Sequence, residues 1–206
     1  MRADLRLSPL GRSALHFGVP QTRRRLFLPC DRVRPPEPVT EPLISVRSGC
    51  EILDTEGTWR STPLHNGMRA RPTLERARRA IHALGRGMPF LIVYCGSDGA
   101  GGWHSLHRPI RTITTLDRFG LVTWKNDVPM MRMLQVPELK RAMGFDEGFG
   151  IEQGSRRDRI RLLGNPVCPP VMQAVVRALT RADIPARRVR KRFEANIRLP
   201  EVRQEF

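Results

Sequence analysis

The sequence contains little cysteine, few aromatic residues and no long apolar run. Its four cysteines lie far apart and include no Cys-x-x-Cys pair, so neither a zinc site nor a disulfide framework is indicated. No apolar stretch approaches the roughly 20 residues that span a bilayer, and the first residues lack the apolar segment of a signal peptide. These absences favour a protein of the reducing cytoplasm that binds no metal and no membrane.

Acidic residues are also scarce relative to basic ones. The chain has 36 Lys and Arg residues against 20 Asp and Glu residues, which gives a formal net charge of +16. A charge of this sign favours a polyanionic partner, and nucleic acid is the first candidate. Arginine dominates the excess, and its planar guanidinium suits two-pronged contacts to phosphate and guanine. The alternative is a solvated arginine-rich surface of the kind that GC-rich genomes encode.

Changes in composition divide the chain into five segments. A basic first unit, residues 1–29, is followed by an extended proline-rich linker at 30–42. Short β runs and helical patterns alternate through residues 43–157. Residues 158–182 end in an apolar helical pattern, and residues 183–206 form a basic, weakly patterned tail. The chain is long enough for one ordinary domain, or for a small domain with part of a larger one.

Periodicity and punctuation predict the main helices and strands. Gly18 indicates a turn that leads into a strand ending near residue 28, with Gln21, Arg23 and Arg25 on one face. Further expected elements are a helix from Thr73 to Leu84 stopped by Gly85, a buried strand at 89–95, a β segment at 110–122, a helix from Pro137 to Met143 and a helix beginning at Pro169. One side of this last helix is expected to carry Val171, Met172, Val175, Val176 and Leu179.

The segment Gly18-Val-Pro-Gln-Thr-Arg-Arg-Arg-Leu-Phe27 is the most informative motif. Two arginines and an amide on one strand face, beside a tight turn, can bind a phosphate or the acceptor edge of a base. Gln21, Arg23 and Arg25 are therefore candidate DNA-binding residues. A random arginine-rich edge strand would give the same local pattern, so the motif alone leaves both interpretations open.

A second motif, Gly164-Asn-Pro-Val-Cys-Pro-Pro-Val171, stands near the other end of the chain. A glycine-asparagine turn ahead of a helix N-terminus presents a polar side chain and unpaired N–H groups to a ligand. Asn165 and Val167 are the candidate ligand-contacting residues. Taken alone, the motif is more typical of an ordinary loop that enters a proline-started helix.

Other suggestive residues favour less specific roles. The glycine-rich segment 96–102 precedes a β-rich stretch rather than a helix, which argues against a phosphate-binding loop and for a flexible loop that lets the backbone approach DNA. His104 and His107 lack a third metal ligand nearby in sequence. Cys30 and Cys168 both adjoin proline, and both are expected to be structural.

The two motifs, in this order and separated by a long insertion, resemble the last conserved blocks of the DNA (cytosine-5) methyltransferases. Gly-Val-Pro-Gln-x-Arg-x-Arg is that family's eighth block, whose arginines contact the flipped cytosine and its backbone. The resemblance implies this role for Gln21, Arg23 and Arg25. Gly-Asn-x-Val resembles the tenth block, so the resemblance implies that Asn165 and Val167 line the pocket for S-adenosylmethionine.

The segment from Arg132 to Phe145 resembles the family's ninth block, which mainly holds the small domain together. Gln135 stands where the family usually has threonine, and Met143 stands where it has glutamine. Glu138 and the arginine three residues later can pair across one helical turn. We therefore expect Glu138 and Arg141 to form an ion pair, and Phe145 to lie in the core.

The segment 108–115 resembles a stretch common in bacterial members of the family. Arg108 and Arg111 flank a proline and an isoleucine there, ahead of Thr112-Ile-Thr-Thr115. The resemblance makes these two arginines candidate contacts to double-stranded DNA.

The fold that the resemblance implies is mixed α/β. It consists of a partial Rossmann-like, S-adenosylmethionine-dependent methyltransferase domain with an inserted small target-recognition domain at residues 43–157. Residues 1–29 and 158–182 would be pieces of the catalytic domain. These two pieces should meet in space, because a lone strand and a lone helix cannot bury themselves independently.

Three parts of the family's catalytic machinery do not occur in the sequence as expected. The family's nucleophilic Pro-Cys lies well upstream of the eighth block, whereas Cys30 directly follows that block. Neither Glu-Asn-Val, for cytosine N3, nor Asp-Leu-Phe-x-Gly-x-Gly-Gly, for the cofactor, is present. We therefore expect activity only with a complementing N-terminal methyltransferase subunit. A non-catalytic basic DNA-binding module and an inactive truncated relic of such an enzyme are the alternatives.

Overall fold

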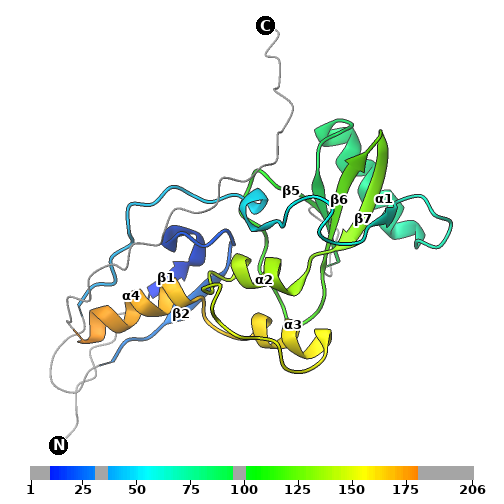
Figure 1. Ribbon diagram of the computed structural model, residues 1–206. Helices are drawn as coiled ribbons and strands as arrows, with labels where there is room; N and C mark the ends of the chain where they lie inside the picture. Colours follow the sequence, from blue (N-terminus) through cyan, green and yellow to red (C-terminus); the bar gives the residue numbers. More distant parts are fainter. Residues whose placement is uncertain (1–9, 31–36, 95–100, 181–206) are drawn as a thin grey trace, which may run out of the picture.

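The computed structural model describes residues 10–30, 37–94 and 101–180 (Figure 1). In chain order its elements are β1 (Leu10–Ser13), the 3-10 helix η1 (Ala14–Phe17), β2 (Arg24–Phe27), the 3-10 helix η2 (Gly49–Ile52), β3 (Thr62–Pro63), α1 (Arg71–Leu84), β4 (Phe90–Val93), β5 (Trp103–Ser105), β6 (Phe119–Lys125), β7 (Val128–Met133), α2 (Val136–Ala142), α3 (Arg156–Gly164) and α4 (Pro169–Thr180). The expected tail at 183–206, most of the glycine-rich segment and half of the linker lie outside the described residues.

Five strands form one antiparallel sheet in the order β3-β7-β6-β4-β5. The expected buried strand is β4, and all of its residues are buried. Asn126 and Asp127 connect β6 to β7 with positive φ angles of 47° and 61°, the conformation that suits the twist of a two-residue hairpin. The combination of helices with a sheet confirms the α/β class in its coarse form.

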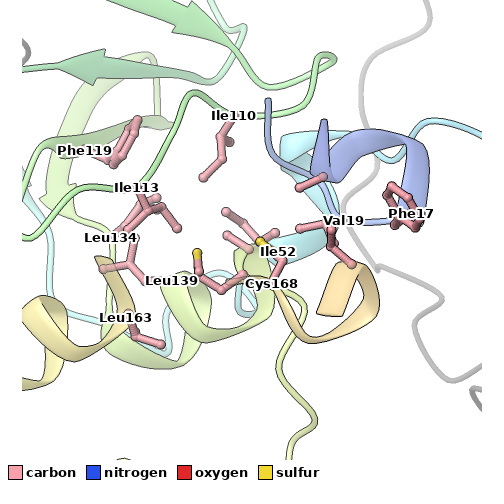
Figure 2. Close-up of a cluster of buried hydrophobic side chains, with 14 of the residues drawn as sticks. Phe17, Val19, Ile52, Ile110, Ile113, Phe119, Leu134, Leu139, Leu163 and Cys168 are labelled. Atoms are coloured by element: carbon pink, nitrogen blue, oxygen red, sulfur yellow. The ribbon is translucent and has the colours of Figure 1, made fainter. Parts of the chain in front are cut away.

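The two faces of this sheet belong to different cores. α1 packs against one face, where its Ala77 and Ala80 join Ile92 of β4 in a small core. Leu91, the preceding residue, points to the other face because side chains alternate across a strand. It joins a larger core that includes Phe119 of β6 together with α2 and α3 (Figure 2).

The two ends of the described chain meet beside this larger core. β1 and β2 pair as an antiparallel ribbon, and α4 lies next to that ribbon (Figure 1). Ala14 and Phe17 of η1 share the larger core with Val171 and Val175 of α4. The expectation that the first strand and the last helix come together is confirmed.

Two boundaries near the sheet differ from the prediction. α1 begins at Arg71 rather than at Thr73, and it ends at Leu84, followed by Gly85, as expected. The β segment predicted from Ile110 begins only at Phe119. Residues before Phe119 run as an extended segment because Ile110 exchanges backbone hydrogen bonds with the turn at residues 20–22 instead of with a sheet strand.

The prediction also differs from the structure near the C-terminal helices. It missed α3, although Ser155 and Asp158 form the capping box that begins this helix. In α4, Val171 and Val175 are buried, but Met172 and Val176, predicted on the same side, are 40% and 41% exposed. A helix that packs against one neighbour buries a stripe of roughly 100°, and Met172 and Val176 lie beside that stripe.

Candidate functional site

Gln21 lies at the junction of three segments and is fully buried. Gly18 ends η1 with a φ of 73°, so the chain turns sharply before Gln21. The Gln21 Nε2 donates a hydrogen bond of 3.0 Å to the Ala142 carbonyl, and its Oε1 accepts one of 2.7 Å from the Ile113 amide. The side chain therefore ties the first motif to α2 and to the segment after residue 110.

Arg23 is buried as well, and its guanidinium hydrogen-bonds to backbone carbonyls from two distant segments. Nη1 donates to the Ile113 carbonyl at 2.8 Å, and Nη2 donates to the Gly164 and Pro166 carbonyls at 2.8 and 3.1 Å. Burial, together with the neighbouring charge of Arg25, lowers the pKa of the Arg23 guanidinium from its ordinary value. Arg23 thus joins the first motif directly to the second.

Arg25 is exposed, unlike Gln21 and Arg23, with which it is grouped in the first motif. β2 begins only at Arg24, so the three predicted residues do not share one strand face. Gln21 and Arg23 point into the protein, whereas Arg25 is exposed and its guanidinium donates to the Arg24 carbonyl at 2.8 Å, with no other partner among the described residues. The predicted grouping on one face is corrected for this reason: Arg25 alone has a guanidinium available to a ligand.

A small hollow brings the two motifs together. Arg23 and Arg25 line it from the first motif, and Val167 and Cys168 line it from the second. Asn165 is the C-cap of α3, two residues before Val167, and its side chain is exposed with no hydrogen-bond partner in the described parts of the chain. An apolar side chain of the second motif therefore borders two neighbouring arginines of the first.

Gly164 is required by close packing at the end of α3. A Cβ atom at this position would lie 2.3 Å from the Thr114 carbonyl carbon and 2.5 Å from the Thr115 nitrogen. Backbone atoms cannot move aside as the end of a flexible side chain can. The glycine of the Gly-Asn motif thus lets α3 touch the segment that Arg23 also holds.

Replacing Gly164 by alanine is expected to lower the free energy of unfolding by about 1–3 kcal/mol, as overpacking of a tight contact does. Urea denaturation followed by circular dichroism measures the change. Gly150→Ala is the matched control, since no atom lies within 4 Å of a Cβ placed there. Equal losses in the two variants would contradict the assigned contact.

The described cysteines do not supply a reactive thiolate beside this hollow. Cys168 is buried, and burial raises the pKa of its thiol to about 11. The thiol therefore stays protonated at neutral pH, and the expected structural role of Cys168 is supported. Cys30 is exposed, and its Sγ lies 3.4 Å from the Leu28 carbonyl.

Arg108 and Arg111, the other candidate DNA contacts, lie on the segment between β5 and β6. Arg108 is exposed, and Arg111 is half-buried with Nη2 at 3.5 Å from the Trp103 carbonyl. His104 Nε2 lies 2.9 Å from the Pro109 carbonyl, and burial lowers the pKa of this imidazole. The ranges that the structure describes hold no group of three His, Cys, Asp or Glu side chains that could bind a metal ion.

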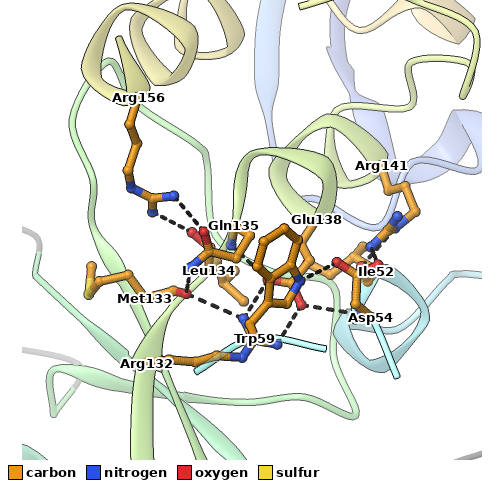
Figure 3. Close-up of polar contacts among 10 residues, drawn as sticks. All are labelled: Ile52, Asp54, Trp59, Arg132, Met133, Leu134, Gln135, Glu138, Arg141 and Arg156. Atoms are coloured by element: carbon orange, nitrogen blue, oxygen red, sulfur yellow. Dashed lines mark hydrogen bonds and ion pairs between the residues drawn. The ribbon is translucent and has the colours of Figure 1, made fainter. Parts of the chain in front are cut away.

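A buried carboxylate organises the ninth-block segment (Figure 3). Glu138 is fully buried and accepts two hydrogen bonds from Arg132, at 2.7 and 2.6 Å. It also accepts from the backbone N–H of Gln135 at 2.7 Å and from the backbone N–H of Asp54 at 3.1 Å. The predicted pair between Glu138 and Arg141 is wrong.

Arg141 instead pairs with the Asp54 carboxylate and donates to the Ile52 carbonyl at 2.8 Å. The helix places Arg141 toward η2, whereas Arg132 reaches Glu138 from β7. Sequence reasoning could not find Asp54, because nothing local marks a partner so distant along the chain. Phe145 is half-buried, packs against the larger core and stacks on Phe149, with ring centroids 4.5 Å apart.

Comparison with family models identifies the lineage. Residues 56–181, more than half of the chain, match the C-5 cytosine-specific DNA methylase model. The chain belongs to this family. The matched range contains the segments Arg132–Phe145 and Gly164–Val171, while the Gly18–Phe27 motif precedes it. No curated protein matches the chain.

The family acts on DNA and generally uses S-adenosylmethionine, which fits the basic composition of this methylase chain. The family match confirms the resemblance to the DNA (cytosine-5) methyltransferases, while the assignment of the individual blocks stays a prediction. None of the helices in the described ranges is long and apolar enough to cross a membrane.

Proposed function

We propose that this chain is the C-terminal portion of a DNA (cytosine-5) methyltransferase. It binds double-stranded DNA, recognises the target through residues 43–157, holds the flipped cytosine and completes the S-adenosylmethionine pocket. The observation that carries this proposal is the contact between the two motifs: Arg23 donates to the Gly164 and Pro166 carbonyls, and Arg25 adjoins Val167. A cytosine must leave the stack before its C5 and C6 can be reached, and a site for it needs donors beside the methyl source.

In this proposal Arg25 contacts the target nucleotide, because its guanidinium is exposed next to the second motif. Arg23 is a positioning residue that keeps the Gly164–Pro166 turn in place through its hydrogen bonds. S-adenosylmethionine, when bound, supplies the methyl group. Asn165 would donate to it or accept from it, and Val167 would provide apolar contact. Arg108 and Arg111 would contact DNA beside the target.

Attack on cytosine C6 requires a thiolate, which adds to the ring and makes C5 nucleophilic. The buried Cys168 thiol, with its raised pKa, does not fit this role. We therefore assign the nucleophile to a complementing N-terminal segment that carries the family's Pro-Cys and Glu-Asn-Val motifs. Leu26 of β2 and Met172 and Val176 of α4 are exposed apolar side chains, which leaves apolar surface that such a segment could cover.

The test combines this chain with a polypeptide that carries the upstream family motifs and measures methyl transfer from labelled S-adenosylmethionine to duplex DNA. Transfer by the mixture, and by neither polypeptide alone, is expected. A well-folded mixture that binds DNA but transfers no methyl group would contradict the proposal. Salt-sensitive DNA binding without any response to S-adenosylmethionine would instead indicate the alternative, a non-catalytic DNA-binding module.

Replacing Arg25 by alanine is expected to reduce methyl transfer in this mixture by roughly 100-fold or more, as the loss of one well-placed charged donor does. The free energy of unfolding should change little, because the Arg25 side chain hydrogen-bonds to the neighbouring Arg24 carbonyl and to no other described residue. Arg24→Ala is the matched control on the same strand. Equal methyl transfer by the two variants would contradict the assignment of Arg25 to the cytosine site.

A further inference from the structure

An arginine-lined groove lies outside the hollow described above. Its volume is about 440 Å³, and it runs between β3, β7 and the beginnings of α2 and α3. Four arginines line it, and no carboxylate does: Arg60, Arg69, Arg132 and Arg156. Figure 3 shows Arg132 and Arg156 approaching from either side of Met133. None of the residues that line this groove belongs to the Gly18–Phe27 motif or to the Gly164–Val171 motif.

Two of these arginines are neutralised by acidic residues behind the groove wall. Arg132 is paired with Glu138 at 2.6 Å, and Arg156 is paired with Asp117 at 2.8 Å. Arg156 also donates to the Leu134 carbonyl at 2.6 Å. The ion pairs hold these two guanidiniums in fixed positions and offset their charge. The two side chains therefore contribute more to the shape of the groove than to its positive potential.

The other two arginines have no acidic partner among the described residues. Arg69 Nη2 donates to the Thr62 hydroxyl at 2.6 Å, which orients its guanidinium, and no carboxylate in the described ranges pairs with it. Arg60 is exposed and has no hydrogen bond or ion pair with any described residue. Two guanidiniums without an ion-pair partner among the described residues therefore line one groove, and such a pair can bind an oxyanion.

The groove is connected to the proposed cytosine site by a short segment. The Ile113 carbonyl accepts the hydrogen bond from Arg23, and Asp117, four residues later, pairs with Arg156 of the groove. The two sites thus lie at opposite ends of the segment 113–117, which Arg23 contacts at one end and Arg156 at the other. A single duplex that places its target base at the first site has further backbone on either side to reach the second.

We propose that this groove binds a phosphodiester of the DNA backbone beside the target base, with Arg60 and Arg69 as its ligands. The inference rests on the proposed function. Phosphate geometry matches the planar guanidinium fork, and backbone contacts of this kind fix the register of a protein on a duplex without determining sequence.

The test measures the affinity of the full chain for duplex DNA across a range of salt concentrations. Arg60→Gln is expected to weaken binding severalfold and to reduce the slope of log K against log[salt] by about one unit, with about one more for Arg60→Gln combined with Arg69→Gln. Arg78→Gln is the matched control, since Arg78 is exposed on α1 and only joins a surface pair with Glu75 at 3.3 Å. It should leave the slope nearly unchanged.

A neutral methylphosphonate placed at each backbone position in turn identifies the contacted phosphate. At one position the wild-type protein should lose affinity while Arg60→Gln loses none. If the wild type binds DNA but the groove variants keep its salt slope, the groove assignment is overturned and the proposed function stands. If the wild type binds no DNA, both fail. Tighter, Arg60-dependent binding to RNA of equal length would overturn the assignment to DNA.

Discussion

Replacing Glu138 by glutamine is expected to lower the free energy of unfolding by about 3–5 kcal/mol, the cost of breaking a buried ion pair by removing one charge. Glu138 is fully buried, and the hydrogen bonds that it accepts from described residues come from Arg132 and from the backbone amides of Gln135 and Asp54. An amide can accept at only one of its two heavy atoms. The variant would therefore leave the Arg132 charge unpaired and turn a donor toward other donors.

Glu152→Gln is the matched control for this substitution, since Glu152 is exposed and has no partner within the described residues. Urea denaturation of both variants compares the free energies of unfolding, and the control should stay within about 0.5 kcal/mol of wild type, as surface substitutions do. Near-equal stability of Glu138→Gln and wild type would show that the Arg132 and Asp54 contacts do not hold β7 and η2 to α2.

The network around Glu138 illustrates which contacts sequence can predict. The position of α2 is predictable because Pro137 and Glu138 are typical of a helix start, and the cap at Gln135 satisfies the same rule. The partner of Glu138 is not predictable in this way. Helical spacing favours Arg141 on local grounds, yet Arg132 reaches the carboxylate from a strand, and only the tertiary fold places it there.

The strands show a similar division. β4 is an unbroken apolar run and is predictable, since a strand buried on both faces needs no alternation. The β6–β7 hairpin has a local signal, Asn126-Asp127, but both residues tolerate positive φ in many kinds of loop. The extended segment after Ile110 has β-like composition without a neighbouring strand to pair with over its length. Composition alone cannot distinguish these cases.

The candidate site was predictable as a set of residues but not as an arrangement. Alternation along a strand groups Gln21, Arg23 and Arg25, yet the pattern cannot show which of them is buried. Burial depends on Ile113 and Gly164, which accept hydrogen bonds from the first motif across a long stretch of chain. The role proposed for these residues comes from the resemblance to the methylase family. In that proposal the contacts make Arg23 a positioning residue and leave Arg25 exposed for the target nucleotide.

Replacing Arg23 by glutamine is expected to lower the free energy of unfolding by about 3 kcal/mol or more, since each buried carbonyl that loses its donor costs about 1–3 kcal/mol. The affected carbonyls belong to Ile113, Gly164 and Pro166. Glutamine is too short and has too few donors to reach both segments. Arg24→Gln, which changes the charge by the same amount on an exposed residue, is the matched control.

Salt dependence separates a positioning role of Arg23 from direct contact with DNA. A guanidinium that neutralises a phosphate contributes about one unit to the slope of log K against log[salt], whereas a buried one that hydrogen-bonds to carbonyls contributes none. We therefore expect Arg23→Gln, measured at a temperature where it remains folded, to keep the wild-type slope. Arg25→Gln should keep the wild-type stability and lose slope. The reverse pattern would assign the DNA contact to Arg23 and would require its guanidinium to leave the Ile113 and Gly164 carbonyls when DNA binds.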